Sequence, residues 1–337
     1  MNRIFNYCCI ITAILMAVSP SIFADSSLPT DHASIGVMGD HTHNAGEWMF
    51  SYRYGRMEMD GNRDGTSSVS VSEIHQDFMI APLDMTMEMH MFGAMFGLND
   101  DVTLMAMIPY KELEMEMITS PMSMGMMPAN YKFKTRSKGF GDLKLSALWN
   151  LMGNDHSSLH ATIGMGVPIG SIKKQDDNAM GVRARMPYMM QLGSGTYDPI
   201  LGLTYVMKYA HWTYGLQTLN TFRLGKNDQG YQLGNEYTAS TWASMNLNHS
   251  VSLSLRLDAK AWENIDGDDD DLDVMMAPTA RTDLRGGQRV DGILGLNYLH
   301  GSGHRLGVEL GVPLHQDLDG PQMKTDYRLM LGWQYAI

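Results

Sequence analysis

Apolar and polar residues alternate with a period of two along most of the chain. In one run, Val251, Leu253, Leu255 and Leu257 alternate with serine and charged residues, and residues 327–337 repeat the pattern with large aromatic and aliphatic side chains. A period of two is typical of β-strands whose two faces meet different surroundings, whereas helical periodicity is weak throughout this sequence. The pattern therefore predicts an all-β protein.

We expect about twelve strands, bounded by residues that favour turns. The expected strands are residues 46–57, 86–98, 101–112, 139–150, 157–169, 198–209, 212–224, 237–248, 250–262, 290–300, 304–313 and 326–337. The connections between these strands are alternately long and short. The long connections are residues 58–85, 113–138, 170–197, 225–236, 263–289 and 314–325.

Short turns at one end of a sheet and long loops at the other are typical of bacterial outer-membrane barrels. A large soluble β-sandwich also alternates, but it would not sort its connections by length so regularly. Closure of the sheet removes the free strand edges that lipid does not tolerate. We therefore predict a transmembrane, antiparallel, up-and-down β-barrel of about 12 strands, with both ends of the chain on the periplasmic side.

The N-terminal residues have the features of a targeting segment. A basic start and a short apolar run, residues 10–18, precede Ile-Phe-Ala at 22–24, which Asp25 follows. Residues 1–24 therefore predict a secretory signal peptide that is cleaved near Ala24. We expect the polar residues 25–45 to form a periplasmic lead-in and residues 46–337 to form the barrel as one domain.

Charge and hydropathy exclude other classes of protein. The formal net charge is −12, and binding of nucleic acid requires a basic surface. A spanning helix needs about 18 consecutive apolar residues, and the sequence after the signal peptide contains no such run. The terminal residues 332–337 resemble the C-terminal signal that the barrel-insertion machinery recognises. We expect an outer-membrane location, with this machinery, membrane lipid and lipopolysaccharide as partners.

The alternation also assigns the two faces of each strand. If the apolar face contacts lipid, the other face lines the lumen, where charges of both signs are interspersed. The predicted lining residues are Arg53, Glu88, His90, Asp142, Lys144, Arg256, Asp258, Lys260, Asp291, Arg305, Glu309 and Arg328. Such a wall either passes small solutes or closes itself through ion pairs, which would leave a structural or adhesive barrel.

Methionine is unusually frequent, with 32 residues in the chain. On the expected strand 86–98 and just before it, Met85, Met87, Met89 and Met91 share one face, which the pattern assigns to lipid. Thioethers elsewhere are soft ligands that select Cu(I) or Ag(I). As an alternative to a protein without cofactor, copper or silver ions would bind Met57, Met59, Met122, Met124, Met126 and Met127, with His41 and His43 on the periplasmic side.

The sequence does not indicate an enzyme. It contains no Gly-x-Ser-x-Gly nucleophile motif. His249 and Ser250 are adjacent, but consecutive residues of a strand point to opposite faces and do not form a nucleophile–base pair. We therefore predict a protein without catalytic residues.

Several short motifs carry a family resemblance. The most specific are Gly-Phe-Gly-Asp-Leu at 139–143 and Gln-Leu-Gly-Ser-Gly-Thr-Tyr-Asp at 191–198, with Met-Gly-Asp-His-Thr-His at 38–43. Over residues 36–337 the chain resembles the methionine-rich branch of the outer-membrane transporter family named for the meta-pathway of phenol degradation. The resemblance implies an outer-membrane barrel that passes small organic molecules. We therefore expect a channel for passive uptake or export of small, partly apolar organic solutes.

Overall fold

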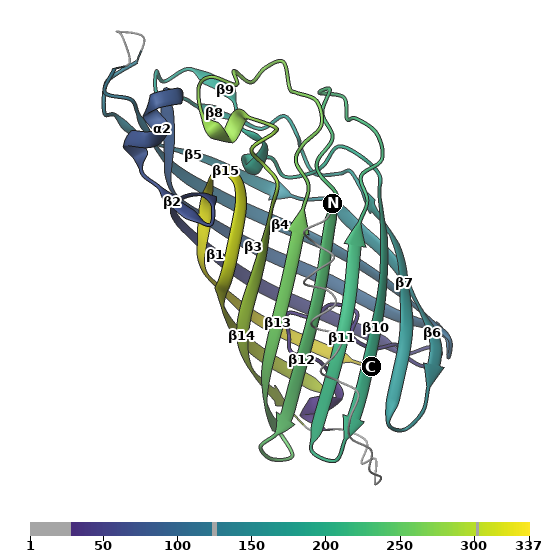
Figure 1. The fold of residues 1–337 in the computed structure, drawn as a ribbon. Coiled ribbons are helices and arrows are strands. Elements are labelled where there is room, and N and C mark those ends of the chain that lie inside the picture. The colour runs from purple at the N-terminus through teal and green to yellow at the C-terminus, as the bar shows by residue number, and fades with distance from the viewer. Residues whose placement is uncertain (1–27, 123–126, 301–302) are drawn as a thin grey trace.

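The computed structural model describes residues 28–122, 127–300 and 303–337. The predicted signal peptide, residues 1–24, lies outside the described residues. The described chain folds into one β-barrel, with long loops gathered at one end and tight turns at the other (Figure 1). None of its helices is long and apolar enough to cross a membrane.

Within the described residues, eleven strands close the barrel, and all neighbouring pairs are antiparallel. In order around the barrel they are β1 (Trp48–Gly65), β3 (Ile80–Asn99), β4 (Val102–Thr119), β6 (Leu143–Gly153), β7 (Ser157–Val167), β10 (Asp198–Tyr209), β11 (Trp212–Thr221), β12 (Glu236–Asn246), β13 (Val251–Trp262), β14 (Gly287–Leu299) and β15 (His304–Ala336). The ring closes where β15 pairs with β1. This architecture confirms the predicted fold class.

Strand β15 crosses the barrel wall twice. Residues 305–318 pair with β14, and residues 318–336 pair with β1. The direction reverses next to Gly320, whose φ of 82° lies in the left-handed region that glycine tolerates best. Counted as crossings, the described wall therefore contains the twelve expected strands. The predicted long connection at 314–325 is wrong, because the strand continues up to this tight turn.

The strands on one side of the barrel are longer than the sequence pattern predicts. Strand β1 continues to Gly65, β3 begins at Ile80, and β4 ends at Thr119. Strand β5 (Lys132–Phe140) pairs with the second half of β4, whereas β6 pairs with its first half. These extensions rise towards the loop end of the barrel (Figure 1). Their alternation continues beyond the apolar belt, with charged residues on the outer face.

The remaining elements are short and lie mostly in the long loops. They are η1 (Pro29–Asp31), β2 (Ser67–Val69), α2 (Val71–Asp77), β8 (Gln175–Asp177), β9 (Arg183–Arg185), η2 (Tyr188–Met190) and η3 (Pro278–Ala280). Helix α2 begins with a capping box, in which Ser70 and Glu73 exchange side-chain and backbone hydrogen bonds. Its buried Ile74 packs with Phe78 and Ala81 beneath the loops.

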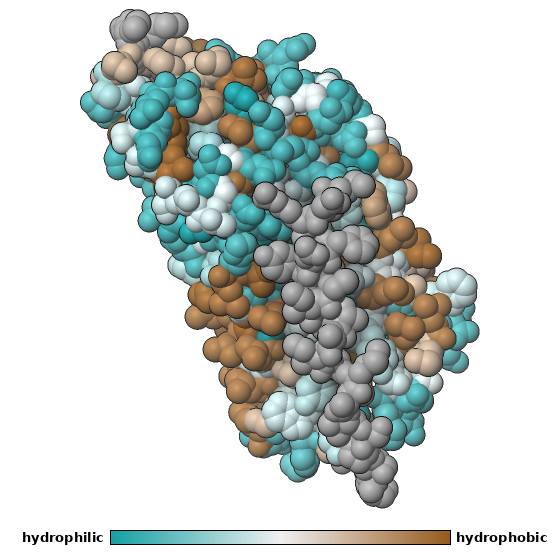
Figure 2. Space-filling model, in the orientation of Figure 1, coloured by the Kyte–Doolittle hydropathy of each residue, from teal (hydrophilic) through white to brown (hydrophobic). Residues whose placement is uncertain are grey.

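The outer surface carries an apolar belt. Figure 2 shows hydrophobic residues gathered across the middle and lower part of the visible face, with hydrophilic residues at both ends. Leu255, Leu294 and Leu310 are among the exposed side chains of this belt, and Trp48 and Trp212 lie beside the turn end. An apolar band with aromatic residues near its edge is the outer face of a membrane barrel. The chain is therefore an outer-membrane β-barrel.

Candidate functional site: the lumen and its N-terminal plug

The interior of the barrel contains the beginning of the described chain. Residues 28–45, here called the N-terminal plug, enter the lumen from the turn end. Arg53 of β1 donates from Nε to the carbonyl of Ile35 at 2.7 Å, and Gln217 of β11 donates from Nε2 to the carbonyl of Met38 at 2.9 Å. His160 of β7 donates to the carbonyl of Gly39 at 2.9 Å. Strands around the barrel therefore hold the plug through its backbone carbonyls.

The wall is shaped to receive the plug. A Cβ atom at Gly332 would lie 2.3 Å from Cγ1 of Ile35, and one at Gly307 would lie 2.6 Å from its Cβ. Only glycine therefore leaves room for Ile35, which is almost completely buried. The sequence predicts a periplasmic lead-in for residues 25–45, whereas the described part of this segment lies inside the lumen. The sequence pattern misses this position because the segment is polar overall, whereas Ile35 and Val37 within it are buried in the lumen.

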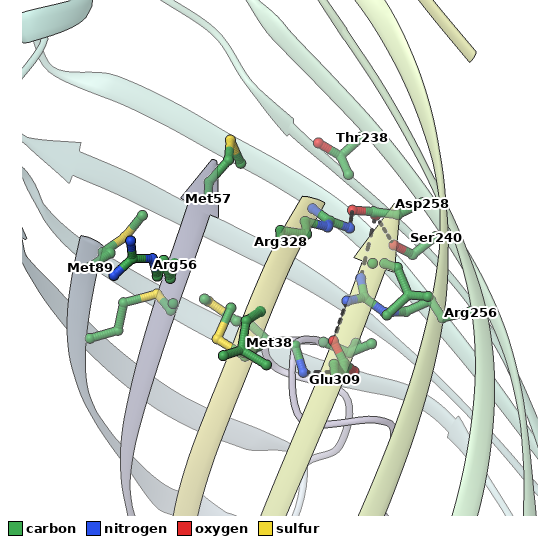
Figure 3. A pocket seen from close by; sticks show the side chains of 18 of the residues that line it. Met38, Arg56, Met57, Met89, Thr238, Ser240, Arg256, Asp258, Glu309 and Arg328 are labelled. Carbon is green, nitrogen blue, oxygen red and sulfur yellow. Dashed lines mark hydrogen bonds and ion pairs between the residues drawn. The ribbon is translucent and has the colours of Figure 1, made fainter. Parts of the chain in front are cut away.

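Charged residues of β13 and β15 form a ladder against the plug (Figure 3), and Asp291 of β14 extends it. Arg256 contacts Glu309 at 2.6 Å and Asp258 at 3.6 Å, while Arg328 contacts Asp258 and lies 3.3 Å from Asp291. Glu309 also accepts a hydrogen bond from the backbone N–H of Gly36 at 3.0 Å. The ladder therefore joins the wall to the plug and satisfies its own charges inside the lumen.

Most of the other predicted lining residues also point inwards. Lys260 forms an ion pair with Glu236 at 2.7 Å. Asp142 accepts hydrogen bonds from the backbone N–H groups of Gly170 and Ser194. Lys144 also points inwards, since it is half-buried next to the outward-facing Leu145. Arg305 is buried in the lumen, where it donates hydrogen bonds to the side chains of Asn297 and Gln334 and to the carbonyl of Ala33.

Glu88 and His90 lie on the outer face instead of lining the lumen. The hydroxyl of Tyr52 lies 2.7 Å from Nδ1 of His90, and Tyr52 shares its face with the exposed Phe50. Glu88 pairs with Arg56 at 2.8 Å on the same outer face. The rule that the polar face points inwards therefore fails on β3, because its methionine face is the inner one.

The methionines that the pattern assigns to lipid are interior residues. Met85 is fully buried at 0% exposure, and Met91 is 4% exposed. A continuous apolar cluster fills the loop end of the lumen. Its methionines are Met57, Met59, Met79, Met85, Met87, Met115, Met117, Met127, Met186, Met189, Met190, Met276 and Met323. Methionine is flexible and unbranched, so it fills such an irregular space well.

The described residues of the predicted metal-ligand set lie at the two ends of the barrel. Met57, Met59 and Met127 belong to the methionine cluster at the loop end, whereas the exposed Met122 does not. His43 lies at the other end, where its backbone N–H donates to Thr103 near the start of β4 at 2.7 Å. The remaining members of that set, Met124 and Met126, lie outside the described residues, and His41 lies beside His43 in the plug.

A cavity of about 290 Å³ lies between the plug and the wall. One side of it is sulfur-rich and the other is the charged ladder (Figure 3). Its methionines are Met38, Met57, Met87, Met89, Met91 and Met330, and its charged residues include Arg256, Asp258, Glu309 and Arg328. The sequence pattern misses the methionine side, because it assigns Met87, Met89 and Met91 to lipid. One feature of the sequence could have indicated the correct inner face. The other face of β3 changes from phenylalanine to charged residues towards the loops, as expected for an outer face that leaves the lipid.

The plug also concentrates imidazole groups. The rings of His32 and His41 have centroids 4.5 Å apart, and those of His41 and His43 are 4.8 Å apart. Burial, reinforced by the neighbouring His41, lowers the pKa of His43 to about 4. The same two causes hold the pKa of His32 well below its ordinary value. Both rings are therefore neutral at pH 7.

Comparison with known proteins agrees with this fold. No protein-family model matches the sequence, and no curated protein matches it. An outer-membrane channel from Pseudomonas putida F1 is similar over 90% of this chain and 100% of its own, with a TM-score of 0.60 at 17% identity. The β domain of the Bordetella autotransporter BrkA covers 87% of this chain and 100% of its own, with a TM-score of 0.47 at 10% identity. The TodX deltaS2S3 mutant, a monoaromatic hydrocarbon channel, covers 87% of this chain and 91% of its own, with a TM-score of 0.46 at 7% identity.

Proposed function

We propose that this barrel is an outer-membrane channel for the passive passage of small, partly apolar organic solutes. The observation that carries the proposal is the cavity of about 290 Å³ with one methionine side and one charged side. A solute with an apolar body and a polar group has a matching surface for each part. The Pseudomonas putida protein with the same fold is itself an outer-membrane channel, which supports the proposal.

The two sides of the cavity act differently on a solute. The methionine side chains adapt to apolar groups of varied shape, because each has three rotatable bonds. The ladder opposite presents alternating charges that orient a polar group without holding it tightly, since each charge already has a partner. Passage past the plug then requires local movement of the segment around Gly36 and Met38, which lines the cavity.

The proposal is tested by solute flux into vesicles that contain the purified protein. We compare phenol, which is partly apolar, with xylose, which is polar. The variant Met89→Trp fills the cavity from the inner face of β3, and Phe92→Trp adds bulk to the outer face of the same strand as a matched control. We expect phenol flux to exceed xylose flux and to fall in Met89→Trp alone. Flux equal to that of protein-free vesicles would support the closed, structural barrel instead.

A second candidate function is the handling of Cu(I) or Ag(I). The observation that favours it is the position of the methionines, because thioethers in a lumen are accessible to an ion in a way that thioethers in lipid are not. The test is a Cu(I) titration against a chelator, comparing the wild type with a variant in which Met87, Met89 and Met91 are all leucine. Equal Cu(I) affinity of the two proteins would exclude these methionines as ligands.

A further inference from the structure

Three side chains of the N-terminal plug bring metal-ligand atoms close together, and a fourth side chain, that of His43, lies beside them. One ligand atom from each of His32, Asp40 and His41 lies within 4.8 Å of the others. Oδ1 of Asp40 lies 3.0 Å from Nδ1 of His41. The ring of His43 packs edge-on against His41, at 4.8 Å between centroids. Three imidazoles and a carboxylate are a ligand set that zinc and related divalent ions prefer.

The protein leaves nitrogen atoms of this set unsatisfied. Nδ1 of His32, Nε2 of His41 and Nε2 of His43 are buried and have no hydrogen-bond partner among the described residues. The whole His43 residue is only 7% exposed. Buried polar atoms without partners are costly, and a bound ion is one of the few ways to satisfy several of them together. The second oxygen of Asp40 is already fixed, because it accepts the backbone N–H of Ala33 at 2.7 Å.

We propose that His32, Asp40, His41 and His43 form a binding site for one divalent transition-metal ion of the zinc type, and that this ion fastens the plug. The ligands come from two points of the chain, so an ion between them closes the intervening segment, residues 33–39, into a loop. That loop includes the groups that the wall recognises, namely the carbonyls of Ile35 and Met38 and the N–H of Gly36. A closed loop has fewer alternative conformations, which strengthens its docking in the lumen.

The proposed site differs in chemistry from the methionine side of the cavity. Imidazole and carboxylate favour divalent ions, whereas thioethers favour Cu(I) or Ag(I). The two sites also use different residues, because none of the four proposed ligands lines the cavity. The proposal therefore does not depend on the solute that the channel passes, and its test does not use transport.

The test is Zn²⁺ titration of the purified, detergent-folded protein by calorimetry. The wild type should bind one Zn²⁺ ion at this site. The double variant His32→Gln with His41→Gln should bind it more than about 10-fold more weakly, since it lacks two ligands. His156→Gln removes an exposed histidine from the turn between β6 and β7 and should bind like the wild type. Absence of saturable binding to the wild type, or equal affinity in the double variant, would overturn the site.

Two further measurements keep the test decisive. Co²⁺ in place of Zn²⁺ should give a visible absorption spectrum of imidazole coordination, which the double variant should lack. If the double variant does not fold, Asp40→Asn replaces it, because the amide oxygen still accepts from the N–H of Ala33. Amide hydrogen exchange of residues 33–39 should slow when Zn²⁺ is added to the wild type but not to the double variant. Unchanged exchange in the zinc-bound wild type would overturn the fastening role.

Discussion

Two sides of the barrel separate lipid from lumen with different residues. On β13 and β14 the outer face carries leucine, such as Leu255, and the inner face carries buried charges, such as Arg256. On β3 the inner face carries methionine, such as Met91, and the outer face changes from Phe92 to Glu88 towards the loop end. The first side follows the rule that apolar residues face lipid, and the second reverses it above the apolar belt.

The difference shows that alternation defines two faces without saying which one is inside. Lipid requires an apolar outer face only within the belt, whereas the lumen can be lined by apolar or by polar side chains, provided that they pack well. The long strands β1, β3 and β4 leave the belt and continue into water, where an outer charge is favourable. Their inner face stays apolar because it packs under the loops, as Met85 and Met115 do.

The largest expected effect concerns the buried ladder. Glu309→Gln removes the charge that pairs with Arg256 at 2.6 Å and leaves that guanidinium with only the more distant Asp258. Breaking a buried ion pair by changing one partner typically costs about 3–5 kcal/mol. We expect a loss of this size in the free energy of unfolding, measured by urea titration in lipid vesicles. A loss below about 1 kcal/mol, as for an exposed pair, would mean that this part of the lumen is well hydrated.

The second prediction tests the reversed face directly. Phe92→Arg places a charge on the outer face of β3 within the apolar belt, where Phe92 is 48% exposed, and should destabilise the barrel by about 2 kcal/mol. Met89→Gln changes the neighbouring inner face, where the polar group meets the cavity, and should have the smaller effect. The readouts are the folded fraction after insertion, from gel mobility without heating, and urea unfolding. The opposite order of effects would restore the lipid-facing assignment of the methionines.

Much of the barrel follows from the sequence because lipid imposes simple chemistry. The strand number, the alternation of long and short connections from β1 to β14 and the inward charges of β13 to β15 are examples. The plug is harder to predict, since Ile35 is a single apolar residue in a polar segment, and its space depends on Gly307 and Gly332 from distant strands. The metal-ligand set of His32 with Asp40 is equally hidden, because the intervening chain must fold back first.

The third prediction concerns the methionine side of the cavity. Replacement of Met87, Met89 and Met91 by leucine conserves apolar volume, so the cost should stay below about 1.5 kcal/mol per substitution. Leucine is branched and less adaptable, so we expect the variant to fold normally but to pass a narrower range of solutes. Urea unfolding and vesicle flux for a series of phenols of increasing size measure the two effects. Equal flux across the whole series in both proteins would show that side-chain flexibility is not needed.

The smallest expected effect concerns the outer charges of β3. Glu88→Gln removes an ion pair with Arg56 that is similar in length, at 2.8 Å, to the buried pair of Glu309. Arg56 and Glu88 are both partly exposed, and Arg56 also contacts Glu58. In the variant, water and the Glu58 carboxylate therefore still solvate the charge of Arg56. Exposed pairs contribute about 0–1 kcal/mol, and we expect a change within that range, which shrinks further in high salt. A loss as large as that of Glu309→Gln would place Glu88 in a dry environment and contradict the outer face described for it.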